Sequence, residues 1–213
     1  MKKTAIALAM FVGLTTVSQA STITGNAEAG KNKSATCAAC HGADGNSMIP
    51  ANPTLAGQSA DYLFKQLKDF KSGDRSNAIM SGMVAALSEQ DMKDLATYFS
   101  AQEAKAGSTP EFIKNKKGEE VDVVKVAGQL YKAGNATTGL TACSACHLPD
   151  GSGLPLAGFP KLSGQHAEYI ANQLKAFREG DRANDLNGMM QKIAAKLSDK
   201  EITLLSNYIS GLH

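Results

Sequence analysis

The sequence predicts an all-α protein built from two similar halves. The second part of the chain repeats, in the same order, the short motifs of the first part. Within each half, apolar residues recur at the three- and four-residue spacing of helices, and no stretch shows a convincing strand pattern. These two observations favour two small helical domains over one large domain.

The internal repeat extends over most of the chain. Residues 41–45 match residues 147–151, and residues 53–58 match residues 160–165. The separation between matched residues grows from 106 to 110 positions along the chain, so the second copy needs only short insertions. This pattern indicates a tandem duplication. The other matched pairs are Tyr62 and Tyr169, Gln66 and Gln173, Leu67 and Leu174, Phe70 and Phe177, Gly73 and Gly180, Asp74 and Asp181, Arg75 and Arg182, Asn77 and Asn184, and Ser88 and Ser198.

Each half is expected to contain a short leading helix, a longer second helix and a last helix. The last helix has a clear start signal, because a serine is followed three positions later by an acid, the arrangement of a capping box. The expected ranges are 27–35 and 122–132 for the leading helix, 59–71 and 166–179 for the second helix, and starts at Ser88 and Ser198 for the last helix.

Glycines have two expected roles in these helices. Gly30 and Gly128 lie within the leading helices, where a small residue lets another helix approach closely. Gly73 and Gly180 follow the second helices and are expected to end them. Each half is therefore expected to use glycine in both roles.

The first residues have the pattern of a secretory signal peptide. Lys2 and Lys3 precede an apolar run over residues 5–14, and small residues at 18–20 suit cleavage before Ser21. The run is shorter than the ~20 residues that a membrane-spanning helix needs, and no later segment is apolar enough to cross a bilayer. Residues 1–20 are therefore expected to be removed during export, which places the mature chain in the periplasm.

The mature chain is expected to divide into a first domain over 21–105, a linker over 106–121 and a second domain over 122–213. The linker contains a charged run over 114–120, which is interpreted as a solvated connection. Of 22 basic and 20 acidic residues in the chain, two lysines leave with the signal peptide, so the mature chain has 20 of each. This balance gives no indication of nucleic-acid binding.

A five-residue motif occurs once in each half. Residues 37–41 read Cys-Ala-Ala-Cys-His, and residues 143–147 read Cys-Ser-Ala-Cys-His. Cys-x-x-Cys-His is the attachment signature of c-type haem: two thiols on one helical turn can bond the two vinyl groups, and the next residue supplies an iron ligand. Two covalently bound haem c groups are therefore expected, attached through Cys37, Cys40, Cys143 and Cys146, with His41 and His147 as iron ligands.

Three alternatives to haem fit the motif less well. A zinc site needs four neighbouring ligands, whereas the two cysteine pairs lie 106 positions apart. A redox-active Cys-x-x-Cys does not require a following histidine, and a structural disulfide does not require it either. The repeated histidine therefore favours haem over all three.

A methionine is the expected second ligand to each iron, because a neutral thioether opposite histidine closes the iron in electron-carrying haems. The duplication selects among the six methionines of the mature chain. Met80 and Met190 each lie eight positions before the serine that is expected to cap the last helix of their half. Met83 and Met189 align with isoleucines and are the second choice. His166 and His213 are expected to be surface residues rather than ligands.

The motifs together resemble cytochrome c4. Each half has a Cys-x-x-Cys-His motif, a Pro-x-Leu-x-Gly-Gln stretch and a methionine before a Leu-Ser-capped last helix. The resemblance covers essentially the whole mature chain. It implies two tandem class I cytochrome c domains, each wrapped around one haem, that pack together with their haems close. It also implies that the carbonyls of Pro53 and Pro160 accept a hydrogen bond from Nδ1 of His41 and His147.

The resemblance further implies a protein that carries single electrons and is not an enzyme. Its partners would be redox proteins, with a quinol-oxidising complex or another cytochrome as donor and a terminal oxidase as acceptor. Loose association with the inner membrane is compatible with this role. Two alternatives stay open: a cytochrome subunit bound tightly to a periplasmic dehydrogenase or oxidase, and a dihaem peroxidase. Matched methionines in both halves argue against the peroxidase, which needs an open iron.

Overall fold

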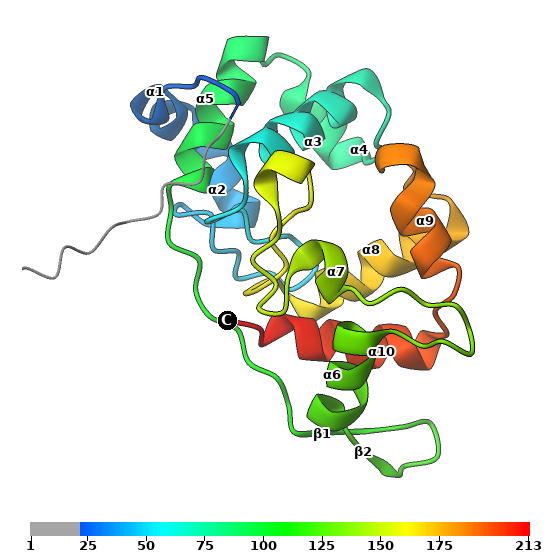
Figure 1. The fold of residues 1–213 in the computed structure, drawn as a ribbon. Coiled ribbons are helices and arrows are strands. Elements are labelled where there is room, and N and C mark those ends of the chain that lie inside the picture. Colours follow the sequence, from blue (N-terminus) through cyan, green and yellow to red (C-terminus); the bar gives the residue numbers. More distant parts are fainter. Residues whose placement is uncertain (1–21) are drawn as a thin grey trace, which may run out of the picture.

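The computed structural model describes residues 22–213; the expected signal peptide lies outside these residues. The described chain folds into two helical halves that lie against each other (Figure 1). The first half contains α1 (Ala27–Lys33), α2 (Ala35–His41), α3 (Ala60–Ser72), α4 (Ala78–Val84) and α5 (Glu89–Ser100). The second half contains α6 (Val123–Ala133), α7 (Ser144–His147), η1 (Pro155–Ala157), α8 (Ala167–Glu179), η2 (Leu186–Gly188), α9 (Met189–Ala194) and α10 (Asp199–Ser210).

The expected helices form in both halves. The capping boxes are complete: the Ser88 side chain accepts from the Asp91 amide while the Asp91 carboxylate accepts from the Ser88 amide, and Ser198 and Glu201 repeat the exchange. The second helices end at glycine, where Gly73 adopts a left-handed conformation that L-residues rarely adopt. Local sequence signals therefore determine where these helices begin and end.

The leading helix of each half packs against the last helix. A Cβ atom added to Gly30 would lie 2.1 Å from the carbonyl oxygen of Asp94, so α1 and α5 approach backbone to backbone. In the second half, a Cβ atom at Gly128 would lie 3.2 Å from the Tyr208 ring, which permits a less intimate approach of α6 and α10. The prediction of close approach at these two glycines is confirmed.

Each half has its own apolar cluster. In the first half, Leu95 and Phe99 of α5 pack with Leu63 of α3. In the second half, the larger cluster contains Tyr131 and Ile202, neither of which exposes any surface. Cys37 and Cys143 border these clusters. The motif cysteines therefore lie where each core meets the expected haem.

The linker is the part of the fold that the sequence did not predict correctly. Phe112–Lys114 (β1) and Glu120–Asp122 (β2) form a two-stranded antiparallel hairpin, with Ile113 paired with Val121. These two side chains pack against the second core, while the charged run at the turn is exposed. The expectation of a chain without strands is therefore wrong for this segment, because the inner face of the hairpin finds apolar cover on α10.

The insertions in the second copy form local turns. Between the aligned residues Asn184 and Met190, three extra positions are accommodated by the η2 turn, in which Asn187 has a φ of 54°. The first copy passes directly into α4, where the Asn77 side chain caps the helix. The helices around each expected haem site thus keep the same order although the connecting loops differ in length.

Candidate haem-binding sites

Each Cys-x-x-Cys-His motif lies at a short helix: the first is within α2, and the second forms α7 with Cys143 as its N-cap. In α2, all three motif residues fall within the last two turns before Gly42, which ends the helix with a φ of 79°. In α7 the corresponding position is Leu148, with a φ of 65° that is uncommon for a residue with a side chain. Its carbonyl accepts a hydrogen bond from Tyr131 at 2.7 Å, which helps to hold that turn. Both motifs thus end in the same sharp turn.

The two motif histidines have matching environments. Nδ1 of His41 lies 2.8 Å from the carbonyl oxygen of Pro53, and Nδ1 of His147 lies 2.9 Å from that of Pro160. Both rings are buried. A carbonyl oxygen can only accept, so Nδ1 carries the proton and Nε2 keeps its lone pair. Each imidazole is therefore fixed in the orientation and tautomer that an iron ligand requires, and the pairing implied by the resemblance is confirmed.

Burial keeps these histidines neutral. It lowers the pKa of His41 and of His147 below the usual value, and the hydrogen bond to the proline carbonyl offsets only part of this effect. A neutral imidazole is the form that can donate a lone pair to a metal. The local protein environment therefore prepares both histidines for ligation.

The motif cysteines are unpaired, and none of the four forms a disulfide. Burial raises the pKa of Cys37, and it raises the pKa of Cys143 to about 11, so both stay as thiols at neutral pH. Within residues 22–213, no three His, Cys, Asp or Glu side chains converge as a metal-binding group. Each half therefore offers one imidazole for the iron and two thiols for covalent attachment, which suits a c-type haem.

The two candidate methionines occupy equivalent places. Met80 lies in the first turn of α4, where its amide donates to the Asn77 side chain at 2.9 Å. Met190 lies in the first turn of α9 and packs against the second core. Met83 is more exposed, at 42%. The assignment of Met80 and Met190 as the second ligands remains a prediction.

The interface between the halves contains polar residues that the sequence matched without giving them a role. Gln58 donates to the carbonyl of Lys161 at 2.9 Å and accepts from the amide of Lys161 at 3.0 Å. Gln165 makes the reciprocal pair with Thr54, at 3.0 and 2.9 Å. Each glutamine ends a Pro-x-Leu-x-Gly-Gln stretch, so this motif joins the halves with approximate two-fold symmetry.

His166 also belongs to this interface. Its Nε2 lies 2.8 Å from the carbonyl oxygen of Ser47 in the other half, and its ring is partly buried. The expectation of a plain surface residue is therefore wrong, although the structure gives no reason to make it an iron ligand. Position alone could not reveal this contact, because the aligned residue in the first half is Ser59.

The chain resembles known proteins over its full length. The family model described as Cytochrome c matches residues 27–103 and 129–213. The chain is 45% identical over 214 residues to the cytochrome c4 of Pseudomonas aeruginosa, an alignment that covers 100% of both chains. The chain belongs to the cytochrome c4 family. A solved structure of reduced recombinant cytochrome c4 from Pseudomonas stutzeri superposes with a TM-score of 0.81 at 46% identity, covering 89% of this chain and 100% of that one.

Membership of the cytochrome c4 family establishes the cofactor and the fold. The chain consists of two tandem cytochrome c domains and carries two covalently bound haem c groups, one at each Cys-x-x-Cys-His motif. It is an electron carrier of this dihaem type. A further relative, named thiosulfate dehydrogenase electron acceptor in Stutzerimonas stutzeri, is 41% identical over 177 residues, covering 83% of this chain and 78% of that protein.

Proposed function

We propose that the chain shuttles single electrons in the periplasm and catalyses no reaction of its own. The observation that carries this proposal is that the same two candidate ligand types are placed alike in both halves. Both halves hold a buried histidine through a hydrogen bond to a proline carbonyl. Both also place a methionine in the first turn of a short helix, α4 or α9. Two irons closed on both faces leave no position for a substrate, which favours a carrier over a peroxidase.

The proposed roles of the site residues follow from their chemistry. Cys37, Cys40, Cys143 and Cys146 form the thioethers that attach the haems. His41 and His147 would hold the iron through Nε2, and Met80 and Met190 would each supply a second ligand. When bound, the haem supplies an iron that alternates between the ferric and ferrous states. The chain limits the rearrangement that accompanies this change, because the proline carbonyls hold both imidazoles in one orientation.

The proposed partners are other redox proteins. A quinol-oxidising complex or another cytochrome would supply electrons, and a terminal oxidase would accept them. No helix among residues 22–213 is long and apolar enough to span a membrane. The proposed location is the periplasm, on the basis of the signal-peptide pattern, with loose association at the inner membrane.

A second candidate role is that of an electron outlet for a periplasmic dehydrogenase. The similarity to a protein named thiosulfate dehydrogenase electron acceptor favours this candidate. The two roles share the same electron-carrying chemistry and differ in the donor, which would be a dehydrogenase rather than a quinol-oxidising complex.

Reduction and reoxidation of the purified holoprotein test the proposal. Membranes supplied with a quinol should reduce both haems, and an added terminal oxidase should reoxidise them without an intermediate carrier. Hydrogen peroxide should be consumed no faster than in control samples in which the haem is blocked. Peroxide turnover with an added electron donor would contradict the carrier proposal, and reduction by thiosulfate dehydrogenase alone would favour the second role.

A further inference from the structure

Two arginines meet at the interface between α3 and α8. Arg75 donates through Nη1 to Gln66 of its own half at 2.8 Å, and through Nη2 to Tyr169 and Gln173 of the other half at 2.9 and 2.8 Å. Arg182 makes the mirror-image bonds, to Gln173 at 2.8 Å and across the interface to Tyr62 at 2.9 Å and Gln66 at 3.0 Å. We call Arg75, Arg182, Gln66 and Gln173 the guanidinium cluster.

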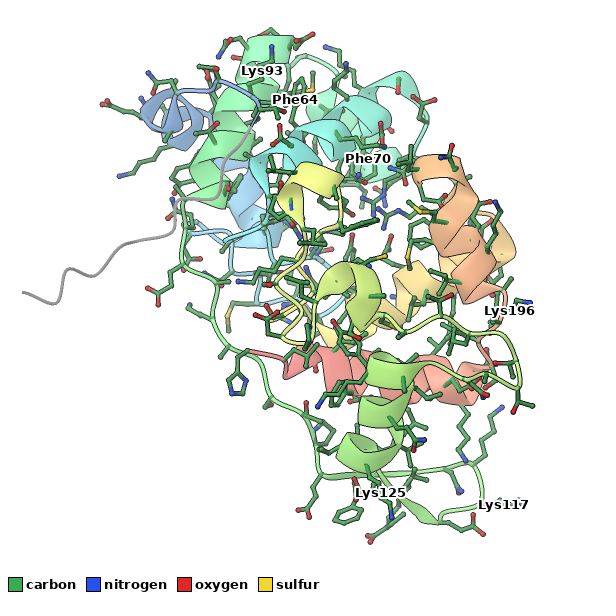
Figure 2. All side chains as sticks on the ribbon, in the orientation of Figure 1. Phe64, Phe70, Lys93, Lys117, Lys125 and Lys196 are labelled. Atoms are coloured by element: carbon green, nitrogen blue, oxygen red, sulfur yellow. The ribbon has the colours of Figure 1, made fainter. Side chains whose placement is uncertain are left out.

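The cluster is shielded from solvent. Arg75 and Arg182 expose only 9% and 7% of their surface. Each guanidinium also stacks on a phenylalanine of its own half, with its central carbon 4.6 Å from the Phe70 ring centre and 4.5 Å from that of Phe177. Figure 2 shows Phe70 where α3 approaches the second half. Water therefore screens these charges poorly.

The acceptors of the cluster are neutral. Among residues 22–213, no carboxylate forms an ion pair with either guanidinium within 4.0 Å. The Asp69 carboxylate accepts from Asn184 and pairs with Lys65 rather than with either guanidinium. Asp185 acts on Arg182 without contact. Two buried positive charges thus lie in one interface without a carboxylate bonded to either.

The tyrosine at the cluster responds to this field. Burial acts to raise the pKa of Tyr62, but the charges of Arg182 and Arg75, together with the hydrogen bond from Arg182 and the charge of Lys65, bring the pKa below its usual value. Arg75 belongs to the same half as Tyr62 and Arg182 to the other half. Tyr62 therefore experiences the charges of both halves, and a field that favours a phenolate also favours any added negative charge nearby.

Each arginine is adjacent in sequence to the segment that carries the candidate methionine of its half. Arg75 is two residues before Asn77, whose side chain caps α4 at the Met80 amide. Arg182 donates through Nε to Asn184 at 3.0 Å, directly before the loop that leads to Met190. Nη2 of each guanidinium donates across the interface to the other half. Each charge therefore lies next in sequence to the candidate site of its own half and bonds side chains of the other half.

We propose that the guanidinium cluster raises the reduction potentials of both haems together, so that an electron on either haem is stabilised by charges contributed from both halves. Arg75 and Arg182 act on the irons through their charge. The inference rests on the proposed function only in that both irons are assumed to take up single electrons.

Two variants separate the charge of the cluster from its hydrogen bonds between the halves. Gln66→Glu keeps the oxygen that accepts from both arginines and adds a negative charge, which should strengthen these hydrogen bonds. Arg75→Gln removes one positive charge and weakens them. We expect both potentials to fall in both variants, although the free energy of unfolding should change in opposite directions. Arg178→Gln is the matched control, because this arginine of α8 already pairs with Asp199 at 2.8 Å and is less buried.

The measurement is a two-step redox titration of each holoprotein, followed in the haem visible bands. A fall in both potentials in Gln66→Glu and Arg75→Gln, with little change in Arg178→Gln, supports the inference. Unchanged potentials in Gln66→Glu, or a fall confined to one haem, would overturn it and make the cluster a local or purely mechanical contact. Haem content and the methionine–iron absorption band are recorded on the same samples, so an error in the ligand assignment is recognised separately.

Discussion

Gln58 binds both backbone groups of Lys161 across the interface, at 2.9 and 3.0 Å, and exposes only 7% of its surface. The same oxygen also accepts from the Ser59 amide at 2.9 Å. A single side chain therefore satisfies polar groups in both halves and at the start of α3. The reciprocal contact of Gln165 with Thr54 means that the interface is made twice by the same residue type.

Replacing Gln58 by leucine should weaken the interface measurably. The backbone amide and carbonyl of Lys161 would lose buried partners, which typically costs about 1–3 kcal/mol. We expect urea unfolding of the holoprotein to show this loss. Gln102→Leu is the control, because Gln102 donates at 2.9 Å to Tyr98 within its own half. A loss in Gln58→Leu no greater than in Gln102→Leu would contradict a role in joining the halves.

Alanine at Gly30 should destabilise the first half. The new Cβ would meet the Asp94 carbonyl oxygen at 2.1 Å and the Tyr98 Cβ at 2.8 Å, so α1 and α5 must separate. Overpacking of this kind costs roughly 1–3 kcal/mol, which thermal unfolding would detect. Gly82→Ala in α4 is the matched variant, because nothing lies within 4 Å of its Cβ position. It should be neutral or stabilising by about 0.4–1 kcal/mol; equal losses at both sites would refute the packing argument.

The capping box of α5 should make stability depend on acid. Hydrogen bonds from the Ser88 hydroxyl and amide, followed by the one from Lys33, lower the pKa of Asp91 from 3.8 to about 2. A carboxyl group with a lowered pKa stabilises the fold at pH values above its ordinary pKa. This contribution is lost as the pH falls from about 4 to about 2. We expect Asp91→Asn to reduce the fall in melting temperature across this window. Lys33→Met should retain most of the fall in melting temperature, since the hydrogen bonds from Ser88 lower the Asp91 pKa more than the one from Lys33 does. An unchanged pH profile in Asp91→Asn would show that the box is not formed.

The sequence could predict what depends on neighbours in the chain. Capping serines, helix-ending glycines and the spacing of the haem motif all act within a few residues, and the duplication tested each of them twice. The hydrogen bonds from His41 and His147 to the proline carbonyls were predicted from the family resemblance alone. These parts of the site agree with the structure.

The interface and the hairpin could not be predicted in the same way. Arg75, Gln66 and Tyr62 appeared as matched residues, but their partners are on the other copy, more than 90 positions away. Their repetition at matched positions in the two copies was the available signal. The hairpin has strands of three residues, too short for an alternating pattern, and it depends on Ile113 and Val121 meeting the second core.

The near-infrared absorption of the oxidised holoprotein tests the central claim most directly. This weak band reports methionine–iron coordination, and a haemochrome assay on the same sample should give two c-type haems per chain. We predict that Met80→Ala and Met190→Ala each remove half of the band, that the double variant lacks it, and that Met83→Leu and Met189→Leu keep it whole. A full band in Met80→Ala or Met190→Ala, or a high-spin spectrum of the unaltered protein at neutral pH, would contradict two closed haems.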